Sequence, residues 1–249
     1  MKKDLLKEFL DKKVIEFENI NFIKKDPIQI PHRFVKKKDI EISAFLTAIL
    51  SWGRRETIIE NSLHLMNIMD NSPYDYILNH TEIDLKKIIN FKHRTFNEAD
   101  LKVFIKALKN IYINHSGLEK CFETNEQKVY NIITNFKLKF FEKYQFSRTH
   151  KHISEPKNGS ACKRIMMFLR WMVRSKNKGV DFEIWKSLKP SQLYCPLDIH
   201  SARISRKLGL IKRKNNDWKT LIELDKNLSK FCPDDPAKYD FALFGIGIN

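Results

Sequence analysis

Residues 196–210 read PLDIHSARISRKLGL, and they join one acidic residue to the start of an apolar, basic segment. Asp198 is followed two residues later by His200 and five residues later by Arg203. The spacing predicts a helix over residues 199–208, for which Asp198 is a suitable N-cap. A carboxylate at the start of a cationic helix also suits an enzyme that stabilises positive charge on a substrate with a negative backbone, such as DNA. The two interpretations of Asp198 can hold together.

Helical periodicity dominates the whole chain of 249 residues, and no alternating strand pattern persists. We therefore predict an all-α fold in which short polar turns join the helices. Asp39 and Asn97 are the expected N-caps of two helices, and loops are expected over 19–37 and 144–160. The expected helices cover residues 3–17, 39–52, 55–70, 97–114, 125–143, 161–175, 199–208, 216–230 and 236–247.

The length is sufficient for a substantial hydrophobic core, and no repeat or low-complexity tract interrupts it. We expect one unit over residues 1–249 with two helical lobes. Residues 40–143 are expected to form a central lobe, and residues 1–39 plus 144–249 the other. An interlobe cleft would then lie close to the basic segments.

The positive charge is concentrated in two segments. The formal net charge is +16, from 46 basic and 30 acidic residues. Residues 145–178 carry nine Lys or Arg and one acid, and residues 199–219 carry seven and one. A solvated, lysine-rich surface could explain the total, but this focusing is typical of a face that binds a polyanion.

The four cysteines have no metal-site spacing. Cys121, Cys162, Cys195 and Cys232 form no C-x-x-C or C-x-x-H pattern, so we expect no zinc site, no iron–sulfur cluster, no other cofactor and no disulfide framework. The sequence also shows no leader-like segment and no long apolar run. We expect a cytoplasmic, nucleoid-associated protein that does not bind membranes.

A second motif precedes another helix. Residues 156–164 read PKNGSACKR and lead into the apolar segment IMMFLRWMV. A glycine before a helix N-terminus lets backbone N–H groups point outward, where they can hold a phosphate. Lys163 lies four residues after Gly159, on the expected first turn. Most lysines at such positions are merely solvated, so Lys163 gains significance only through its combination with Asp198.

The two motifs together resemble the helix–hairpin–helix GPD superfamily of DNA glycosylases. The shared pattern is G-x-x-x-K at the start of a helix, followed by D-x-H-x-x-R-[IV]. In bifunctional members of the superfamily that lysine is the nucleophile and that aspartate is the essential carboxylate, positions matched here by Lys163 and Asp198. Ala161 replaces the second hairpin glycine. The separation of 35 residues is more like that in the archaeal GO glycosylases, a divergent 8-oxoguanine branch. The chain also resembles conserved bacterial proteins of unknown function.

The resemblance implies further site residues. Residues 45–59 look like the early helix and the turn that supplies a residue wedged into the duplex. Residues 239–245 are similar to the last helix of 8-oxoguanine glycosylases, where an aromatic residue stacks on the extruded base. The base pocket implied in this way consists of Trp52, Met167, Asp240 and Phe244. The implied DNA contacts are Gly53, Arg54, Arg55, Lys157, Gly159, Ser160, Ala161, Arg164, His200, Arg203, Arg206 and Lys207.

Each of these assignments has a structural alternative. An aromatic flanked by apolar residues, such as Phe244, is often simple core. Arg54 and Arg55 could cap a surface helix, and Arg203 and its basic neighbours could merely solvate a helix face. His200 fits a structural or phosphate-contacting role better than that of a base.

The resemblance implies a monomeric DNA glycosylase with AP lyase activity, acting on double-stranded DNA with a damaged base, 8-oxoguanine first. In that mechanism a neutral Lys163 forms a Schiff base, and Asp198 stabilises charge on the sugar. A non-catalytic DNA-binding helix–hairpin–helix protein is the main alternative. An RNA-binding protein that uses the same basic face is the third possibility.

Overall fold

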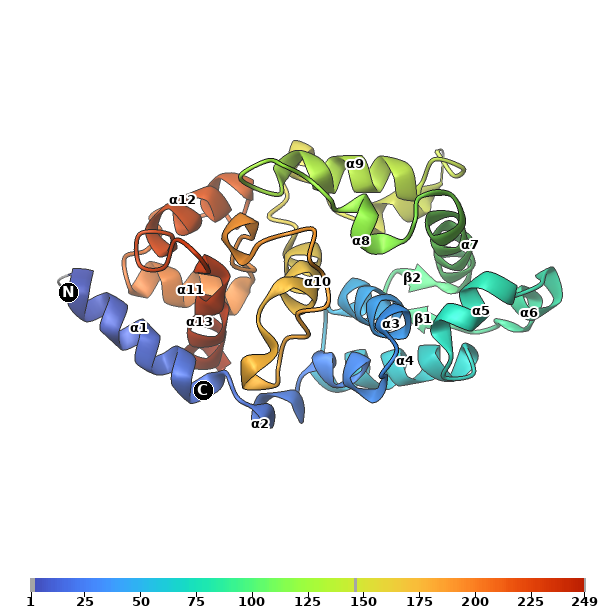
Figure 1. Ribbon diagram of the computed structural model, residues 1–249, viewed down its shortest axis with the longest axis horizontal. Coiled ribbons are helices and arrows are strands. Elements are labelled where there is room, and N and C mark those ends of the chain that lie inside the picture. The colour runs from blue at the N-terminus through green and yellow to red at the C-terminus, as the bar shows by residue number, and fades with distance from the viewer. Residues whose placement is uncertain (1–2, 146, 249) are drawn as a thin grey trace. The chain divides into compact units, whose positions relative to one another are not determined.

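The computed structural model describes residues 3–145 and 147–248, and within these residues the structure is mostly helical (Figure 1). The all-α fold expected from the periodicity is confirmed. Its small β component is a hairpin in which β1 (Lys92–His93) pairs antiparallel with β2 (Phe96–Asn97). The chain divides into two compact units. No helix in the described ranges is long and apolar enough to cross a membrane.

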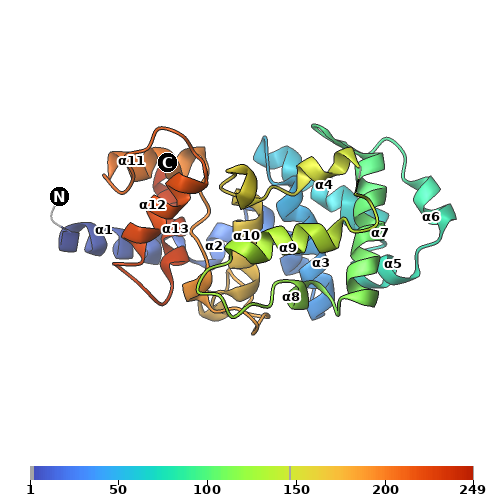
Figure 2. The same ribbon diagram turned by 90° about the horizontal axis from the view of Figure 1, so that it is seen from above.

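Unit 1 comprises Met1–Phe22, Thr124–Asn131 and Glu155–Asn249. Its helices are α1 (Lys3–Phe17), α10 (Lys163–Val173), α11 (Ile199–Lys207), α12 (Trp218–Leu228) and α13 (Tyr239–Ile248). Both α1 and α11 pack against α13, as two views show (Figures 1 and 2). This close packing needs glycine, because a Cβ at Gly245 would lie 2.3 Å from the Phe17 ring and one at Gly247 would lie 2.9 Å from the Cβ of His200.

Unit 2 comprises Ile23–Glu123 and Ile132–Ser154, and α2 (Ile20–Ile23) lies at the division between the units. Its helices are α3 (Lys37–Leu50), α4 (Arg55–Ile68), α5 (Pro73–Asn79), α6 (Glu82–Lys87), α7 (Glu98–Asn114), α8 (Leu118–Cys121) and most of α9 (Tyr130–Phe140). Aromatic rings fill its core, where Phe104 lies 6.1 Å from Phe45 and 5.0 Å from Phe140 between ring centroids. Such aromatic clusters contribute beyond their buried area.

The expected helix caps had different outcomes. Asn97 caps α7 as predicted, since its side chain accepts a hydrogen bond from the N–H of Asp100 in a capping box. The prediction for Asp39 was wrong. Helix α3 begins at Lys37, and Asp39 lies in its first turn, where its carboxylate accepts a hydrogen bond from the N–H of Tyr74 at 2.9 Å.

Several helix boundaries differ from those expected. The helix expected over 125–143 is shorter, because α9 begins only at Tyr130. The expected loops 19–37 and 144–160 contain α2 and short 3-10 helices. Helices α5, α6 and α8 were not predicted, although Pro73 at the start of α5 and the capping box at the start of α6 are recognised start signals.

The division into units also differs from the expected lobes in three segments. Residues 23–39 and 144–154, which were grouped with the terminal segments, belong to unit 2. Residues 124–131, which were grouped with the central helices, belong to unit 1. Both sequence motifs, at 156–164 and 196–210, therefore lie in unit 1 together with helices α1 and α13.

Candidate active site

Lys163 and Asp198, which are 35 positions apart in the sequence, form an ion pair in unit 1. The Lys163 Nζ lies 3.9 Å from the Asp198 Oδ2, and the two side chains are 33% and 16% exposed. The distance is that of an ion pair without a direct hydrogen bond. The partial exposure leaves both groups within reach of an incoming molecule.

The hairpin loop, residues 156–162, places Lys163 at the first position of α10. The loop turns twice through left-handed backbone, at Gly159 (φ 76°) and at Cys162 (φ 50°). The hydroxyl of Ser160 accepts a hydrogen bond from the N–H of Cys162 at 3.1 Å. The second left-handed residue is therefore Cys162, while Ala161, at the position of the missing glycine, is buried. The loop achieves its turn without that glycine.

The carboxylate of Asp198 uses its two oxygens differently. Oδ1 accepts a hydrogen bond from the N–H of Ser201 at 2.8 Å, and the Ser201 hydroxyl accepts one from the N–H of Asp198 at 2.8 Å. These reciprocal bonds form a capping box at the start of α11. Oδ2 is the atom that faces Lys163. The cap and the ion pair thus exist at the same time.

One face of α10 continues the site inward. Lys163, Met167 and Arg170 are spaced four and three residues apart, so they follow one face of the helix. Met167 is half-buried, whereas Arg170 is only 3% exposed. The Arg170 guanidinium donates a hydrogen bond to Oδ2 of Asp240, on α13, at 2.5 Å.

Asp240 is itself buried and close enough to the pair to feel its charges. The pKa of Asp240 is raised to about 6, chiefly by burial and in addition by the charge of Asp198, although Arg170 and Lys163 act to lower it. A buried carboxyl with such a pKa can exchange a proton near neutral pH. The carboxylate predicted to bind a base therefore lies in the same electrostatic environment as Lys163 and Asp198, with Arg170 as its partner.

A chain of buried ion pairs extends from Arg170. Its Nε lies 3.4 Å from Asp181, and the other oxygen of Asp181 accepts a hydrogen bond from Arg174 at 2.6 Å. Arg174 also pairs with Glu18 and Asp235, each at 2.9 Å. Burial alone would lower the pKa of Arg174, but the three carboxylates outweigh it and raise the pKa. The network ties α10 and its C-cap Arg174 to the residue after α1, to α13 and to the segment before α13.

The residues after Asp198 lie against the end of α13. Nδ1 of His200 lies 3.2 Å from the carbonyl oxygen of Gly247, and the Arg203 guanidinium donates a hydrogen bond to the same oxygen at 2.6 Å. A cation there complements the negative end of the helix dipole. Phe244, half-buried on α13, has the rings of His200 and Phe22 at centroid distances of 6.3 and 6.2 Å. His200 and Arg203 were both expected to contact DNA, and the structure shows that each contacts the end of α13.

The other basic residues of unit 1 that were expected to contact DNA differ in their exposure. Lys157 and Lys207 are exposed. Arg206 is instead engaged, because its guanidinium donates hydrogen bonds to the carbonyls of residues 213, 214 and 215 and to the side chain of Asn216. Arg164 is half-buried, and burial lowers its pKa to about 10.

Trp52, Gly53, Arg54 and Arg55 belong to unit 2, at the turn between α3 and α4. The Arg94 guanidinium, from the β1–β2 hairpin, lies 4.6 Å from the Trp52 ring centroid, which is a cation–π distance. Gly53 has a φ of 117°, and a Cβ there would lie 3.2 Å from the Arg94 side chain. Arg54 is exposed and Arg55 half-buried. Arg94 therefore covers part of the ring that was expected to stack on a base.

Sequence reasoning missed three residues that shape these sites: Arg170, Asp181 and Arg94. Arg170 did carry a signal, since a single arginine inside the apolar run IMMFLRWMV must find a buried acid. Its partners follow 11 and 70 residues later, and nothing local identifies them. In residues 3–145 and 147–248, no group of three or more His, Cys, Asp or Glu side chains could hold a metal ion.

The chain belongs to a family described as a protein of unknown function, DUF2400, whose pattern it matches over residues 26–249. The match includes both sequence motifs, the hairpin loop and the helices α10, α11 and α13. No curated protein and no solved structure matches the chain.

Proposed function

We propose that this chain is a DNA glycosylase with AP lyase activity that removes an oxidised purine, 8-oxoguanine first, from duplex DNA. The observation that carries the proposal is the ion pair of Lys163 and Asp198, at 3.9 Å and partly exposed. An amine and a carboxylate held together beside a cationic surface are the two groups that such a reaction needs.

The chemistry assigns one role to each residue. Lys163 gives a proton to Asp198 and attacks C1′ of the damaged nucleotide as a neutral amine. A bond forms between nitrogen and C1′, and the glycosidic bond breaks with its electron pair leaving on the base, which takes up the proton held by Asp198 and so returns Asp198 to its ionised form. The C1′–O4′ bond then breaks, one of the two protons on the nitrogen passes to O4′, and the other stays on the nitrogen of the resulting protonated Schiff base. Loss of a 2′ proton then expels the 3′ phosphate. Ionised Asp198 stabilises the positive charge that develops on the sugar.

The proposed pocket for the extruded base is formed by Met167 on α10 and by Asp240 and Phe244 on α13. Asp240 would accept hydrogen bonds from N1–H and the exocyclic amine of a guanine, while Arg170 holds its other side. The half-buried ring of Phe244 would stack on the base, an interaction worth about 1–3 kcal/mol per base. Extrusion itself costs a few kcal/mol, so a receiving pocket is necessary.

The remaining assignments concern the DNA. The exposed Lys157 and Lys207, with the backbone of the hairpin loop, would contact phosphates near the damaged base. We propose a monomer that needs no cofactor and works on the DNA of the nucleoid.

Borohydride trapping on a duplex with one 8-oxoguanine tests the proposal, because borohydride reduces a Schiff base to a stable amine. We expect a covalent adduct with the wild-type protein and none with Lys163→Gln. Lys157→Gln, an exposed lysine of the hairpin loop, is the matched control and should still give the adduct. If the wild-type protein gives no adduct and cleaves no damaged duplex, the bifunctional assignment is wrong.

The same experiment addresses the alternative of a non-catalytic DNA-binding protein. The capping bond from Ser201 to Asp198 favours that alternative, since it accounts for Asp198 without any chemistry. A protein of this kind would bind the duplex, give no adduct and show no dependence of cleavage on Lys163 or Asp198.

A further inference from the structure

A second loop of unit 1 lies directly beside the hairpin loop. We name residues 212–219 the lysine loop, because they include Lys212, Lys214 and Lys219. The N–H of Trp218 donates a hydrogen bond to the carbonyl of Gly159 at 2.8 Å, and Ser160 forms an isolated antiparallel bridge with Asp217. Two segments far apart in the sequence therefore form one surface.

Internal hydrogen bonds fix the shape of the lysine loop. Arg206 of α11 reaches across it and binds the carbonyls of residues 213 and 214 at 2.8 Å each. Thr220 donates a hydrogen bond from its hydroxyl to the carbonyl of Asn215 at 2.6 Å. The Arg213 side chain donates to Asp217 at 2.8 Å. These bonds hold the backbone of the loop in one conformation.

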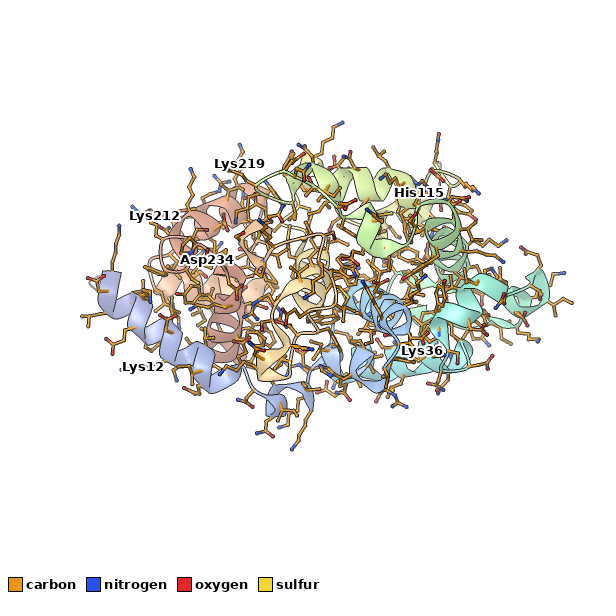
Figure 3. The ribbon with its side chains drawn as sticks, in the orientation of Figure 1. Lys12, Lys36, His115, Lys212, Lys219 and Asp234 are labelled. Carbon is orange, nitrogen blue, oxygen red and sulfur yellow. The ribbon has the colours of Figure 1, made fainter. Side chains whose placement is uncertain are left out.

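The acidic groups of this region do not neutralise its lysines. Glu223 accepts a hydrogen bond from the backbone N–H of Lys212 at 2.8 Å, and Asp217 is engaged by Arg213 and by the N–H of Thr220. Lys212 and Lys219 point away from the chain (Figure 3), and both are exposed, as Lys214 is. Among the described residues, none pairs with an ammonium group of these three lysines. Exposed ammonium groups on one loop attract a polyanion.

We propose that the lysine loop binds the phosphate backbone of duplex DNA and extends the phosphate-binding surface of the hairpin loop along the duplex. The proposal rests on the proposed function for the choice of DNA as the polymer, but it does not depend on the chemistry at Lys163. The lysine loop supplies affinity without sequence preference, because ammonium groups of flexible side chains recognise phosphates and not base edges.

The experiment is a salt titration of binding to a short undamaged duplex, measured by fluorescence anisotropy. The test protein carries Lys212→Gln and Lys219→Gln. The control carries Lys12→Gln and Lys36→Gln, which remove the same charge from exposed positions on α1 and before α3 (Figure 3). Each phosphate contact contributes about 0.9 to the slope of log K against log salt. We expect the slope to become less steep by about 1.8 in the test protein and to change by less than about 0.5 in the control.

Equal slopes in the wild-type, test and control proteins would overturn the proposal. Stronger competition by single-stranded RNA than by duplex DNA at equal salt would overturn the choice of partner. The result is separable from that for the active site. Normal trapping with an unchanged slope would refute the proposal for the lysine loop alone. A reduced slope without any trapping would refute the glycosylase assignment and leave the proposed DNA-binding surface standing.

Discussion

Asp198→Asn separates the two roles that the structure gives to one side chain. An asparagine keeps the side-chain oxygen that accepts the hydrogen bond from Ser201, now at 2.8 Å, and Asn equals Asp as an N-cap residue. The pair with Lys163 is partly exposed at 3.9 Å, and such pairs contribute less than about 1 kcal/mol to folding. We therefore expect Asp198→Asn to change the free energy of unfolding by less than about 1 kcal/mol.

Trapping should respond very differently. Loss of the negative charge beside Lys163 removes both the proton acceptor and the stabilisation of the sugar cation, and such groups contribute about 10²–10⁴ in rate. We expect the single-turnover trapping rate of Asp198→Asn to fall by at least about 100-fold. Asp198→Ala should lose the same rate and, in urea unfolding, about 1 kcal/mol of stability from the missing cap.

Asp217→Asn is the matched control, because Asp217 caps α12 through the N–H of Thr220 at 2.9 Å and is not part of the pair with Lys163. It should trap at close to the wild-type rate. If Asp198→Asn traps at the wild-type rate, Asp198 has no catalytic role and serves as a helix cap. A loss of stability in Asp198→Asn as large as in Asp198→Ala would refute the assignment of Oδ1 as the capping atom.

Three further predictions concern the packing behind the site. Gly245→Ala should lower the free energy of unfolding by about 1–3 kcal/mol in urea titration, because a Cβ there would lie 2.3 Å from the Phe17 ring; an unchanged midpoint would contradict the packing of α1 on α13. Arg170→Ala should cost about 3–5 kcal/mol by the same measurement, because it removes the buried guanidinium that pairs with Asp240 and leaves Asp181 with Arg174 as its remaining arginine partner; a cost below about 1 kcal/mol would argue against the buried network. The folded-state pKa of Asp240, about 6, exceeds that of an ordinary Asp, so the unfolded chain loses this proton at lower pH than the folded one. Its contribution to stability is fully present below about pH 4 and is lost as pH rises to about 6. The stability of the wild type relative to Asp240→Asn should therefore fall over that window in urea titrations at each pH, and a rise would reverse the assigned shift.

The sequence predicted the helices whose signals are local. Helix α7 has both a cap at Asn97 and buried residues at helical spacing, including Leu101, Phe104 and Leu108, and it is found where expected. Helix α9 begins five residues later than predicted, because its apolar pattern does not show where the chain leaves the irregular segment before Tyr130. The short helices α5 and α6 escaped notice because a single turn or two shows little periodicity.

The candidate site was predictable only in its exposed part. Lys163 and Asp198 each sit at the start of a helix, in a recognisable motif, and the structure brings the two together. Arg170 could not be assigned a partner, since Asp181 lies in the irregular segment after α10 and Asp240 lies on α13, and no local pattern links either to Arg170. Arg206 was expected to contact DNA, yet a guanidinium with five donors is equally suited to carbonyl groups, and the loop after α11 supplies them.

The ambiguity of Asp198 has a physical origin. A helix cap needs an acceptor that points toward the first-turn N–H groups, whereas the proposed chemistry needs a negative charge that points away from them toward Lys163. Ser, Thr and Asn offer one side-chain oxygen each, so at this position they could serve the cap but supply no charge. A carboxylate has two equivalent oxygens and satisfies both demands, with Oδ1 on Ser201 and Oδ2 on Lys163. Because one residue type meets both demands, the residue identity cannot distinguish a cap from an acid, and only variants that keep the oxygen while removing the charge can do so.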